Sequence, residues 1–240
     1  MYFDMYYLVL VVPMIILSIL ASAKVNSSFK KYAKVNTKRN LTATEAARQI
    51  LDNHGLHNVR IESISGNLTD HYDPKSNVIR LYDSVRNSTS VAAVGVAAHE
   101  AGHAVQHAEG YSFIKIRNSL VPVANLGSQL SMPLIIIGLV LMGAESIFGS
   151  MMVYAGIILF SLAVLFQIVT LPVEFDASNK AIRVLGEGGY LYEDEVKDVK
   201  TVLSAAAMTY VAAAATSIAQ LLRFVNPKKG NSFAIFRRAT

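Results

Sequence analysis

The chain has 240 residues, of which 52% are hydrophobic and only 16% are charged, well below the roughly 25% of charged residues in soluble domains. This composition excludes a disordered chain and an ordinary water-soluble globule. The absence of cysteine excludes disulfides, thiolate metal ligands and cysteine nucleophiles. The formal net charge of +5 is placed where it suits a membrane surface, so we expect a lipid bilayer, and no nucleic acid, as a partner.

Three segments have the length and composition of membrane-spanning helices, each of which needs about 20 apolar residues. The first lies in residues 1–23 and forms an N-terminal transmembrane anchor. The other two come from residues 118–173, which contain no Lys or Arg and a single carboxylate, Glu145. We expect a transmembrane helical hairpin with its turn near residues 143–150. A pair of buried helices in a soluble core is the alternative, but two consecutive charge-free stretches of this length favour the membrane.

A fourth segment, residues 201–222, also lacks charge but is rich in alanine. Small residues favour close helix packing over lipid contact, so this apolar helix either spans the membrane or packs against the polar part of the chain. Both alternatives stay open, which gives three to four transmembrane helices. A basic tail, residues 223–240, follows it.

The positions of Lys and Arg predict the orientation of the anchor. Residues 24–39 carry six of them and residues 1–5 carry none, so the N-terminus is expected outside. Residues 25–117 and the segment from Glu174 then face the cytoplasm. A cleaved signal peptide is the competing interpretation, because residues 21–23 resemble a cleavage site, but a signal peptide has its basic cluster before the apolar run. A spanning fourth segment would place the basic tail outside, against the same rule.

The polar segment after the anchor is expected to contain a helix, three strands and a second helix. A capping box formed by Thr42 and Glu45 predicts the start of the first helix, and Gly55 predicts its end. Alternating apolar and polar residues predict the strands, and a turn between the second and third makes them a β-hairpin. The expected strands are residues 58–64, 68–72 and 78–82.

The second helix, which Ser88 or Ser90 can cap, carries the motif His99-Glu100-Ala101-Gly102-His103. Two histidines four residues apart project from one face of a helix, so their imidazoles can bind one Zn²⁺ ion. Glu100 adjoins the first ligand and can act as the general base toward water at the metal. A helix with two incidental histidines is the plain alternative.

A catalytic zinc ion takes three protein ligands and keeps one open position. His107 drifts away from the face of His99, and Glu109 stands where a longer motif would have its third histidine. We therefore expect a downstream carboxylate and favour Glu174, which follows two membrane crossings and starts an expected helix. Its alternative role is a helix-start glutamate stabilised by the helix dipole. The candidates are Glu145, Glu174, Glu187, Glu193 and Glu195.

Four blocks of the sequence resemble the YugP-like family of bacterial neutral zinc metallopeptidases, and the resemblance covers nearly the whole chain. The family is similar, more distantly, to HtpX-type membrane peptidases and to the CAAX prenyl protease. The resemblance implies a gluzincin fold with His99, His103 and Glu174 as zinc ligands and Glu100 as the catalytic base. The blocks are LTDHYDP at 68–74, AAHEAGHAVQ at 97–106, LPVEFDAS at 171–178 and AAAMTYVAAA at 205–214.

In gluzincins the third ligand is often followed, three or four residues on, by an aspartate that orients a ligand histidine. Here those positions are Ala177 and Ser178, and Asp176 comes two residues after the ligand. Either Asp176 or Ser178 could therefore orient a ligand histidine without binding the metal itself, and the sequence does not decide between them.

The expected protein is an α+β integral membrane protein, mainly α-helical, with a small zinc peptidase domain. Residues 24–117 form the first half of that domain and residues 174–200 the second. It would cleave a peptide or protein substrate, membrane proteins included, with one zinc ion. The substrate is expected to lie extended along residues 78–82 as an edge strand.

An oxyanion donor is also needed, and the candidates are His71, Tyr72 and Arg183, each of which can equally be an ordinary hairpin or helix residue. The sequence predicts no oligomeric state.

Two other functions are compatible with parts of the sequence. A catalytically inactive zinc-binding membrane scaffold would not need the base Glu100, so the presence of Glu100 favours an enzyme. An ion transporter would carry its ligands inside the spans, whereas His99 and His103 lie on a short helix outside them.

Overall fold

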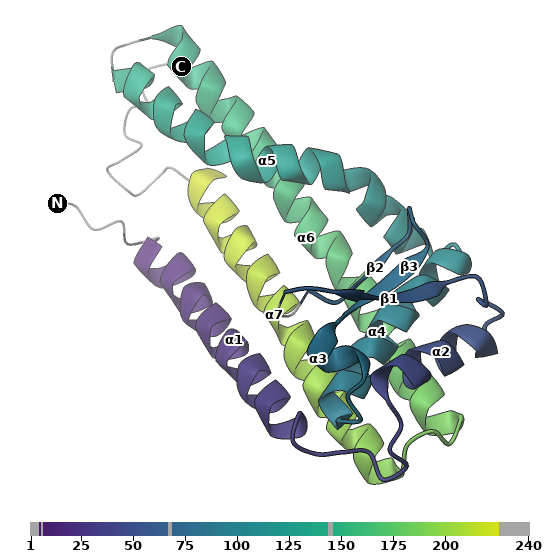
Figure 1. Cartoon of the computed structure of the whole chain (residues 1–240). Coiled ribbons are helices and arrows are strands. Elements are labelled where there is room, and N and C mark those ends of the chain that lie inside the picture. Colours follow the sequence, from purple (N-terminus) through teal and green to yellow (C-terminus); the bar gives the residue numbers. More distant parts are fainter. Residues whose placement is uncertain (1–4, 6, 67–68, 144–145, 226–240) are drawn as a thin grey trace. The chain divides into compact units, whose positions relative to one another are not determined.

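The computed structural model describes residues 5, 7–66, 69–143 and 146–225. The described part is mostly helical, with one small sheet (Figure 1). Four helices are long, and the first of them continues a π-helical turn, Tyr7–Val11. The long helices are α1 (Val12–Tyr32), α5 (Ser112–Gly143), α6 (Ile147–Glu187) and α7 (Glu193–Val225). The short elements are α2 (Ala43–Asn53), β1 (Arg60–Ile64), β2 (His71–Asp73), β3 (Val78–Tyr82), α3 (Asp83–Arg86) and α4 (Val91–Ala108).

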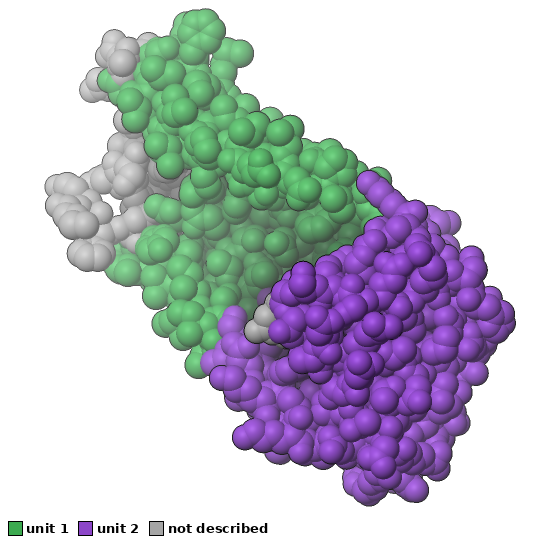
Figure 2. Space-filling view, in the orientation of Figure 1, with its two compact units in different colours: residues 1–20, 116–170, 210–240 green, residues 21–115, 171–209 purple. Residues whose placement is uncertain are grey.

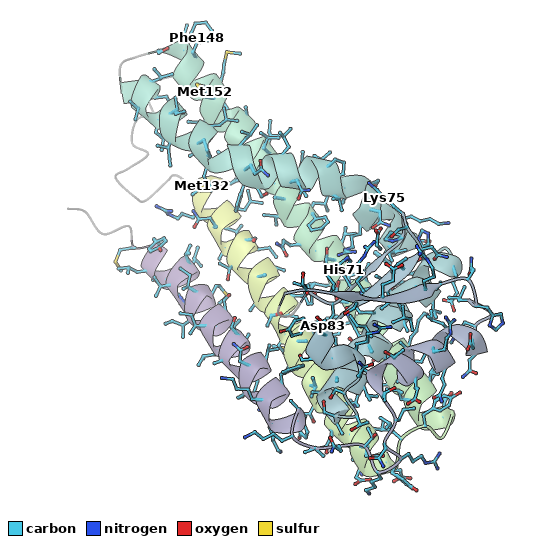
Figure 3. The ribbon with its side chains drawn as sticks, viewed as in Figure 1. His71, Lys75, Asp83, Met132, Phe148 and Met152 are labelled. Atoms are coloured by element: carbon cyan, nitrogen blue, oxygen red, sulfur yellow. The ribbon has the colours of Figure 1, made fainter. Side chains whose placement is uncertain are left out.

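All four long helices are long and apolar enough to cross a membrane. They include α7, which contains the fourth uncharged segment. Large apolar side chains stand exposed on these helices, among them Met132 on α5 and Phe148 on α6 (Figure 3). A water-soluble helix would bury such side chains, whereas a lipid environment stabilises them. The expectation of an α+β membrane protein is therefore confirmed, and Glu145 lies outside the described residues.

The chain divides into two compact units (Figure 2). Unit 1 comprises residues 1–20, 116–170 and 210–240, and unit 2 comprises residues 21–115 and 171–209. Within unit 1, a Cβ on Gly127 of α5 would lie only 2.5 Å from the backbone oxygen of Leu159 on α6. Glycine thus allows these two helix backbones to approach closely, as small residues do in membrane helix pairs.

Unit 2 has its core where α4 packs against α2 on one side and against the sheet. The capping box at the start of α2 is confirmed, because Glu45 N–H donates to Thr42 Oγ1 (3.2 Å) and Thr42 N–H donates to Glu45 Oε2 (2.8 Å). Ser90 caps α4 by accepting a hydrogen bond from Ala93 N–H. The fully buried side chains of this core include Ile50, Leu51, Ile79, Leu81, Val94 and Leu185.

The sheet has the strand order β1-β3-β2. The expected hairpin is confirmed, because β2 pairs antiparallel with β3, while β1 pairs parallel with β3. The strands are shorter than expected at β1 and β2, and residue 68 of the second expected strand lies outside the described residues. The expectation that residues 78–82 form an edge strand is wrong. Since β3 is hydrogen-bonded on both sides, its backbone cannot pair with a substrate.

The helix expected to start near Glu174 is instead the continuation of α6, which runs from Ile147 to Glu187 without a break. Pro172 lies inside it. Proline removes one backbone donor from a helix, but membrane proteins tolerate this where neighbouring groups satisfy the freed carbonyl. Glu174 is therefore a mid-helix residue, and the helix-dipole explanation for its position is wrong.

Candidate metal centre

The helix α4 places the two histidines of the motif. All of its alanines except Ala108 are buried against the rest of unit 2, so the helix is fixed on most of its surface. His99 and His103 lie one turn apart, with their ring centroids 4.6 Å from each other and their planes at 80°. Glu100 is also largely buried, with 9% of its surface exposed.

Glu174 from α6 meets both histidines. Its Oε2 atom lies 3.2 Å from His99 Nε2 and 3.6 Å from His103 Nε2. The three side chains are only 15%, 13% and 4% exposed, for His99, His103 and Glu174 in turn. Within the described part of the chain this is the one group of three or more such residues whose ligand atoms, all within 4.8 Å of one another, could hold a metal ion.

These distances fit zinc. Ligand atoms about 2.0–2.1 Å from a tetrahedral zinc ion lie about 3.3 Å from one another, close to the separations that Glu174 makes with the two histidines. Two imidazole nitrogens and one carboxylate oxygen are a donor set that catalytic zinc sites use, with the fourth position left open. The residues present therefore suit a zinc ion.

A close approach of α4 to α6 brings the ligands together. A Cβ on Gly102 would lie 2.5 Å from the backbone oxygen of Ala177. No larger residue fits there unless the helices separate, so Gly102 lets α6 approach the face of α4 that carries the histidines. The other carboxylates considered, Glu187, Glu193 and Glu195, are not part of the group. Glu195 instead accepts hydrogen bonds from Lys38 N–H and Tyr192 N–H.

Both histidines have a partner on the ring nitrogen that faces away from Glu174. Ser178 Oγ lies 3.1 Å from His99 Nδ1, and Gln106 Oε1 lies 3.0 Å from His103 Nδ1. An amide oxygen only accepts, so His103 Nδ1 carries the proton and its Nε2 lone pair is free for a metal. Asp176, the other candidate, accepts a hydrogen bond from Gln106 Nε2 at 2.8 Å and is joined to the histidine only through Gln106.

Glu100 is held by the sheet. The backbone N–H of Tyr72 on β2 donates to Glu100 Oε2 at 2.9 Å, and the Oε1 atom has no partner among the described residues. Burial by itself lowers the pKa of His103, but its hydrogen bond to Glu174 and the nearby charge of Glu100 raise it, and the net pKa lies above the usual value. A histidine next to two carboxylates is typical of a site that binds a cation, and zinc binding would displace the proton.

The three predicted oxyanion donors have other surroundings in the structure. Tyr72 donates from its hydroxyl to Asn77, and its ring lies near that of His107. His71, labelled in Figure 3, faces Arg80 at 3.4 Å. Arg183 is exposed on α6. No contact among the described residues joins the side chains of these three candidates to His99, His103 or Glu174, the candidate metal-binding group, so their role stays a prediction.

Two residues of the site were not anticipated. Gln106 is fully buried beside His103, and its position three residues after that ligand, inside the AAHEAGHAVQ block, could have indicated it. Asp70 accepts a hydrogen bond from Tyr82 N–H, and burial raises its pKa, with the nearby Glu100 charge acting in the same direction. Asp70 lies inside the LTDHYDP block, which could have indicated it in the same way.

Comparisons with known proteins point the same way. Residues 7–228 match the family described as “Putative neutral zinc metallopeptidase”. The chain is 45% identical over 221 residues to the “Putative membrane protease YugP” of Bacillus subtilis (strain 168), which covers 92% of this chain and 96% of that relative. No solved structure matches.

Proposed function

The chain belongs to this zinc metallopeptidase family, and from that premise we propose that it is a membrane-bound zinc endopeptidase. In this proposal His99, His103 and Glu174 hold one zinc ion and Glu100 is the general base. The observation that carries it is the convergence of the three ligand atoms, since Glu174 lies 75 residues from His99 in the sequence and still reaches its Nε2 atom.

The chain's own residues divide the chemistry among them. When bound, zinc would supply Lewis-acid chemistry, polarising the scissile carbonyl and lowering the pKa of water. Glu100 accepts a proton from the attacking water and passes it to the leaving amine nitrogen. Because Tyr72 N–H occupies Oε2, we assign the proton transfer to Oε1. The same backbone hydrogen bond keeps the carboxylate from rotating away.

The position of strand β2 suits it to bind the substrate. It lies at the edge of the sheet, and the backbone of Tyr72 points toward Glu100 and away from β3. Tyr72 N–H is already bonded to Glu100, so an extended peptide along this edge would pair with the backbone C=O of Tyr72, which places its scissile bond close to the general base. The central strand β3 cannot take this role, because both of its sides are paired.

The basic residues in 24–39 support a cytoplasmic location for unit 2, by the same charge rule that orients membrane proteins in general. In this orientation the peptidase would act on substrates at the inner face of the membrane. Labelling of single cysteines introduced at positions 31 and 75, using an impermeant maleimide on intact cells, tests it. Labelling at either position would place the site on the outer face.

The experiment that tests the proposed activity compares the wild-type protein with Glu100→Gln, both purified in detergent. Metal analysis should find one zinc per chain in each. Cleavage of casein or of a fluorogenic peptide should fall by about 10²–10⁴-fold in Glu100→Gln, the loss typical of a missing general base. Equal cleavage by the two proteins would contradict the proposed peptidase activity with Glu100 as its general base. Zinc in both proteins without cleavage by either would favour the inactive scaffold.

A further inference from the structure

Unit 2 contains a pocket that shares no residue with the proposed zinc site. It is formed by α1 and α7 and has a volume of about 520 Å³. Three lysines line it, Lys24 from α1 and both Lys197 and Lys200 from α7. The rest of the lining includes Ala205 and Met208, so apolar surface lies next to the three positive charges.

The three lysines have no carboxylate partner within the described residues. Two other lysines of unit 2 do have such a partner: Lys38 binds Asp194 at 2.7 Å, and Lys180 binds Glu109 at 3.1 Å. Asp198 lies between two of the pocket lysines in the sequence but does not line the pocket. The pocket therefore carries three uncompensated positive charges, which favours an anionic occupant.

The pocket also lies where the uncharged stretches of two candidate membrane helices end. On α1 and the π-helical turn before it, no charged residue occurs from Tyr7 to Ala23, and Lys24 comes next. On α7 the order is reversed, because Lys200 precedes an uncharged stretch from Thr201 to Leu222. Both changes occur at the same pocket, which is where the polar surface of a bilayer would meet its apolar interior.

We propose that this pocket binds the headgroup of an anionic phospholipid. The phosphate lies among Lys24, Lys197 and Lys200, and the start of an acyl chain lies on Met208 and Ala205. Basic pockets between membrane helices on the cytoplasmic side are suited to such headgroups. A free anion would use the lysines but not the apolar surface, so the combination of both favours a lipid.

Lipid binding to the full chain in nanodiscs tests this proposal. The probe is phosphatidylglycerol, compared with phosphatidylcholine, and native mass spectrometry counts the lipid retained. The wild-type protein should retain phosphatidylglycerol selectively. The triple variant Lys24→Gln/Lys197→Gln/Lys200→Gln should lose about a hundredfold in affinity, roughly fivefold for each lysine near an anionic surface. Ser204→Trp should also lose the lipid, because Ser204 lines the pocket and the larger side chain would fill it without changing charge.

A matched control removes the same charge elsewhere. Lys30, Lys31 and Lys34 are exposed on or just after α1 and do not line the pocket, so their triple glutamine variant should retain the lipid. An equal loss in both triple variants would overturn the proposal in favour of general attraction to a basic surface. Unchanged binding in the pocket variants, or full displacement of the lipid by inorganic phosphate, would overturn it as well. Zinc content should be the same in all variants.

A second inference concerns Gln106 and rests on the proposed zinc site. The side chain is fully buried and has three partners. Its Oε1 atom accepts from His103 Nδ1, and its Nε2 atom donates to Val173 O and to Asp176 Oδ2, both at 2.8 Å. Val173 and Asp176 flank Glu174 on α6. One amide thus connects a ligand histidine with the segment that carries the third ligand.

The geometry points to Gln106 as a positioning residue for both halves of the metal site. It keeps the proton of His103 on Nδ1, so that Nε2 can bind the metal. It also holds the segment around Glu174 at a fixed distance from α4. Lys180 supports the arrangement, because it contacts Asp176 at 3.3 Å and Glu109 at 3.1 Å.

Zinc affinity, measured by competition with a chromophoric chelator, tests this role without measuring activity. Gln106→Leu should weaken zinc binding by about 10–100-fold and change the visible spectrum of the cobalt-substituted protein. Gln106→Glu alone should also weaken it, because two carboxylates would then meet. Combining Gln106→Glu with Asp176→Asn restores a donor opposite an acceptor between these two side chains but leaves Val173 O without its donor, so affinity and spectrum should recover in part.

The neighbouring exposed residue supplies the control, since His107→Gln should bind zinc as the wild type does. Wild-type affinity and spectrum in Gln106→Leu would overturn the positioning role. A double variant that binds zinc no more tightly than Gln106→Glu would overturn the positioning role too. In that case Gln106 would only fill space in the core, without orienting His103. If the wild-type protein itself binds no zinc, the proposed function fails, and this outcome is distinct from a failure of the Gln106 role alone.

Discussion

The two halves of the proposed zinc site are built in different ways. His99 and His103 lie one turn apart on α4, and the geometry of a single helix brings their rings to 4.6 Å. Glu174 lies 75 residues from His99 in the sequence and reaches it only because α6 packs closely on α4. The local half, His99 and His103, therefore depends on one helix. The distant half, Glu174, depends on the contact between two helices. Changes at that contact should affect zinc more than changes elsewhere.

The largest of these effects is expected from Gly102→Ala. The added Cβ would lie 2.5 Å from Ala177 O, a backbone atom that cannot move away alone. We expect the helices to separate, zinc to be lost under mild chelation, and the free energy of unfolding to fall by about 1–3 kcal/mol. Gly186→Ala is the control, because its Cβ would meet Val196 at an ordinary 3.6 Å. Full zinc content in Gly102→Ala would show that the close approach is not required.

A smaller effect is expected from Ser178→Ala, which removes the partner of His99 Nδ1 but leaves all three ligands. Zinc affinity should fall by about tenfold, the lower end of the range for groups that orient a metal ligand. Titration with a competing chelator measures it. The adjacent Asn179 is exposed, so Asn179→Ala should bind zinc normally. If the two variants behave alike, the serine does not orient His99.

A change in the capping box of α2 should affect the stability of the protein without affecting its metal binding. Thr42→Ala removes the acceptor for Glu45 N–H at the start of α2, which packs on α4 without carrying a ligand. The free energy of unfolding should fall by about 1 kcal/mol, while the zinc affinity of the folded protein stays unchanged. Denaturation in detergent and a chelator titration measure the two quantities. A loss of zinc affinity would mean that the positions of His99 and His103 depend on α2 as well as on α4.

The smallest effect is expected from Arg183→Ala. This arginine is exposed on α6, and its side chain makes no contact with the metal-binding group among the described residues. Zinc content and kcat should both stay close to their wild-type values. A fall in kcat of about 10²-fold or more, at unchanged zinc content, would instead identify Arg183 as an oxyanion donor.

The local half of the site and its helix could be predicted because the information lies within a few residues. Ser90 caps α4, and the spacing of His99 and His103 defines one face of the helix. The α2 capping box and the β2–β3 hairpin were predictable for the same reason. Each of these features depends only on residues that are close together in the sequence.

The rest depends on contacts between distant segments. The sequence does not show that β1 joins β3 in parallel, which turns β3 from an edge strand into the central one. The sequence predicts a helix that starts near Glu174, but α6 continues from Ile147 through Pro172 and Glu174. The partnership of Gln106 with His103 and Asp176 likewise appears only once α4 and α6 are packed together.

The role of Glu174 as third zinc ligand is tested most directly by the zinc content of Glu174→Ala after mild chelation, measured beside Glu187→Ala. Both positions lie on α6, but Glu187 is exposed at its end and is not part of the metal-binding group. We expect Glu187→Ala to keep one zinc per chain, whereas Glu174→Ala should lose the metal and the cleavage activity while remaining in the membrane. Stoichiometric zinc in Glu174→Ala would contradict this role, because the third ligand would then lie elsewhere.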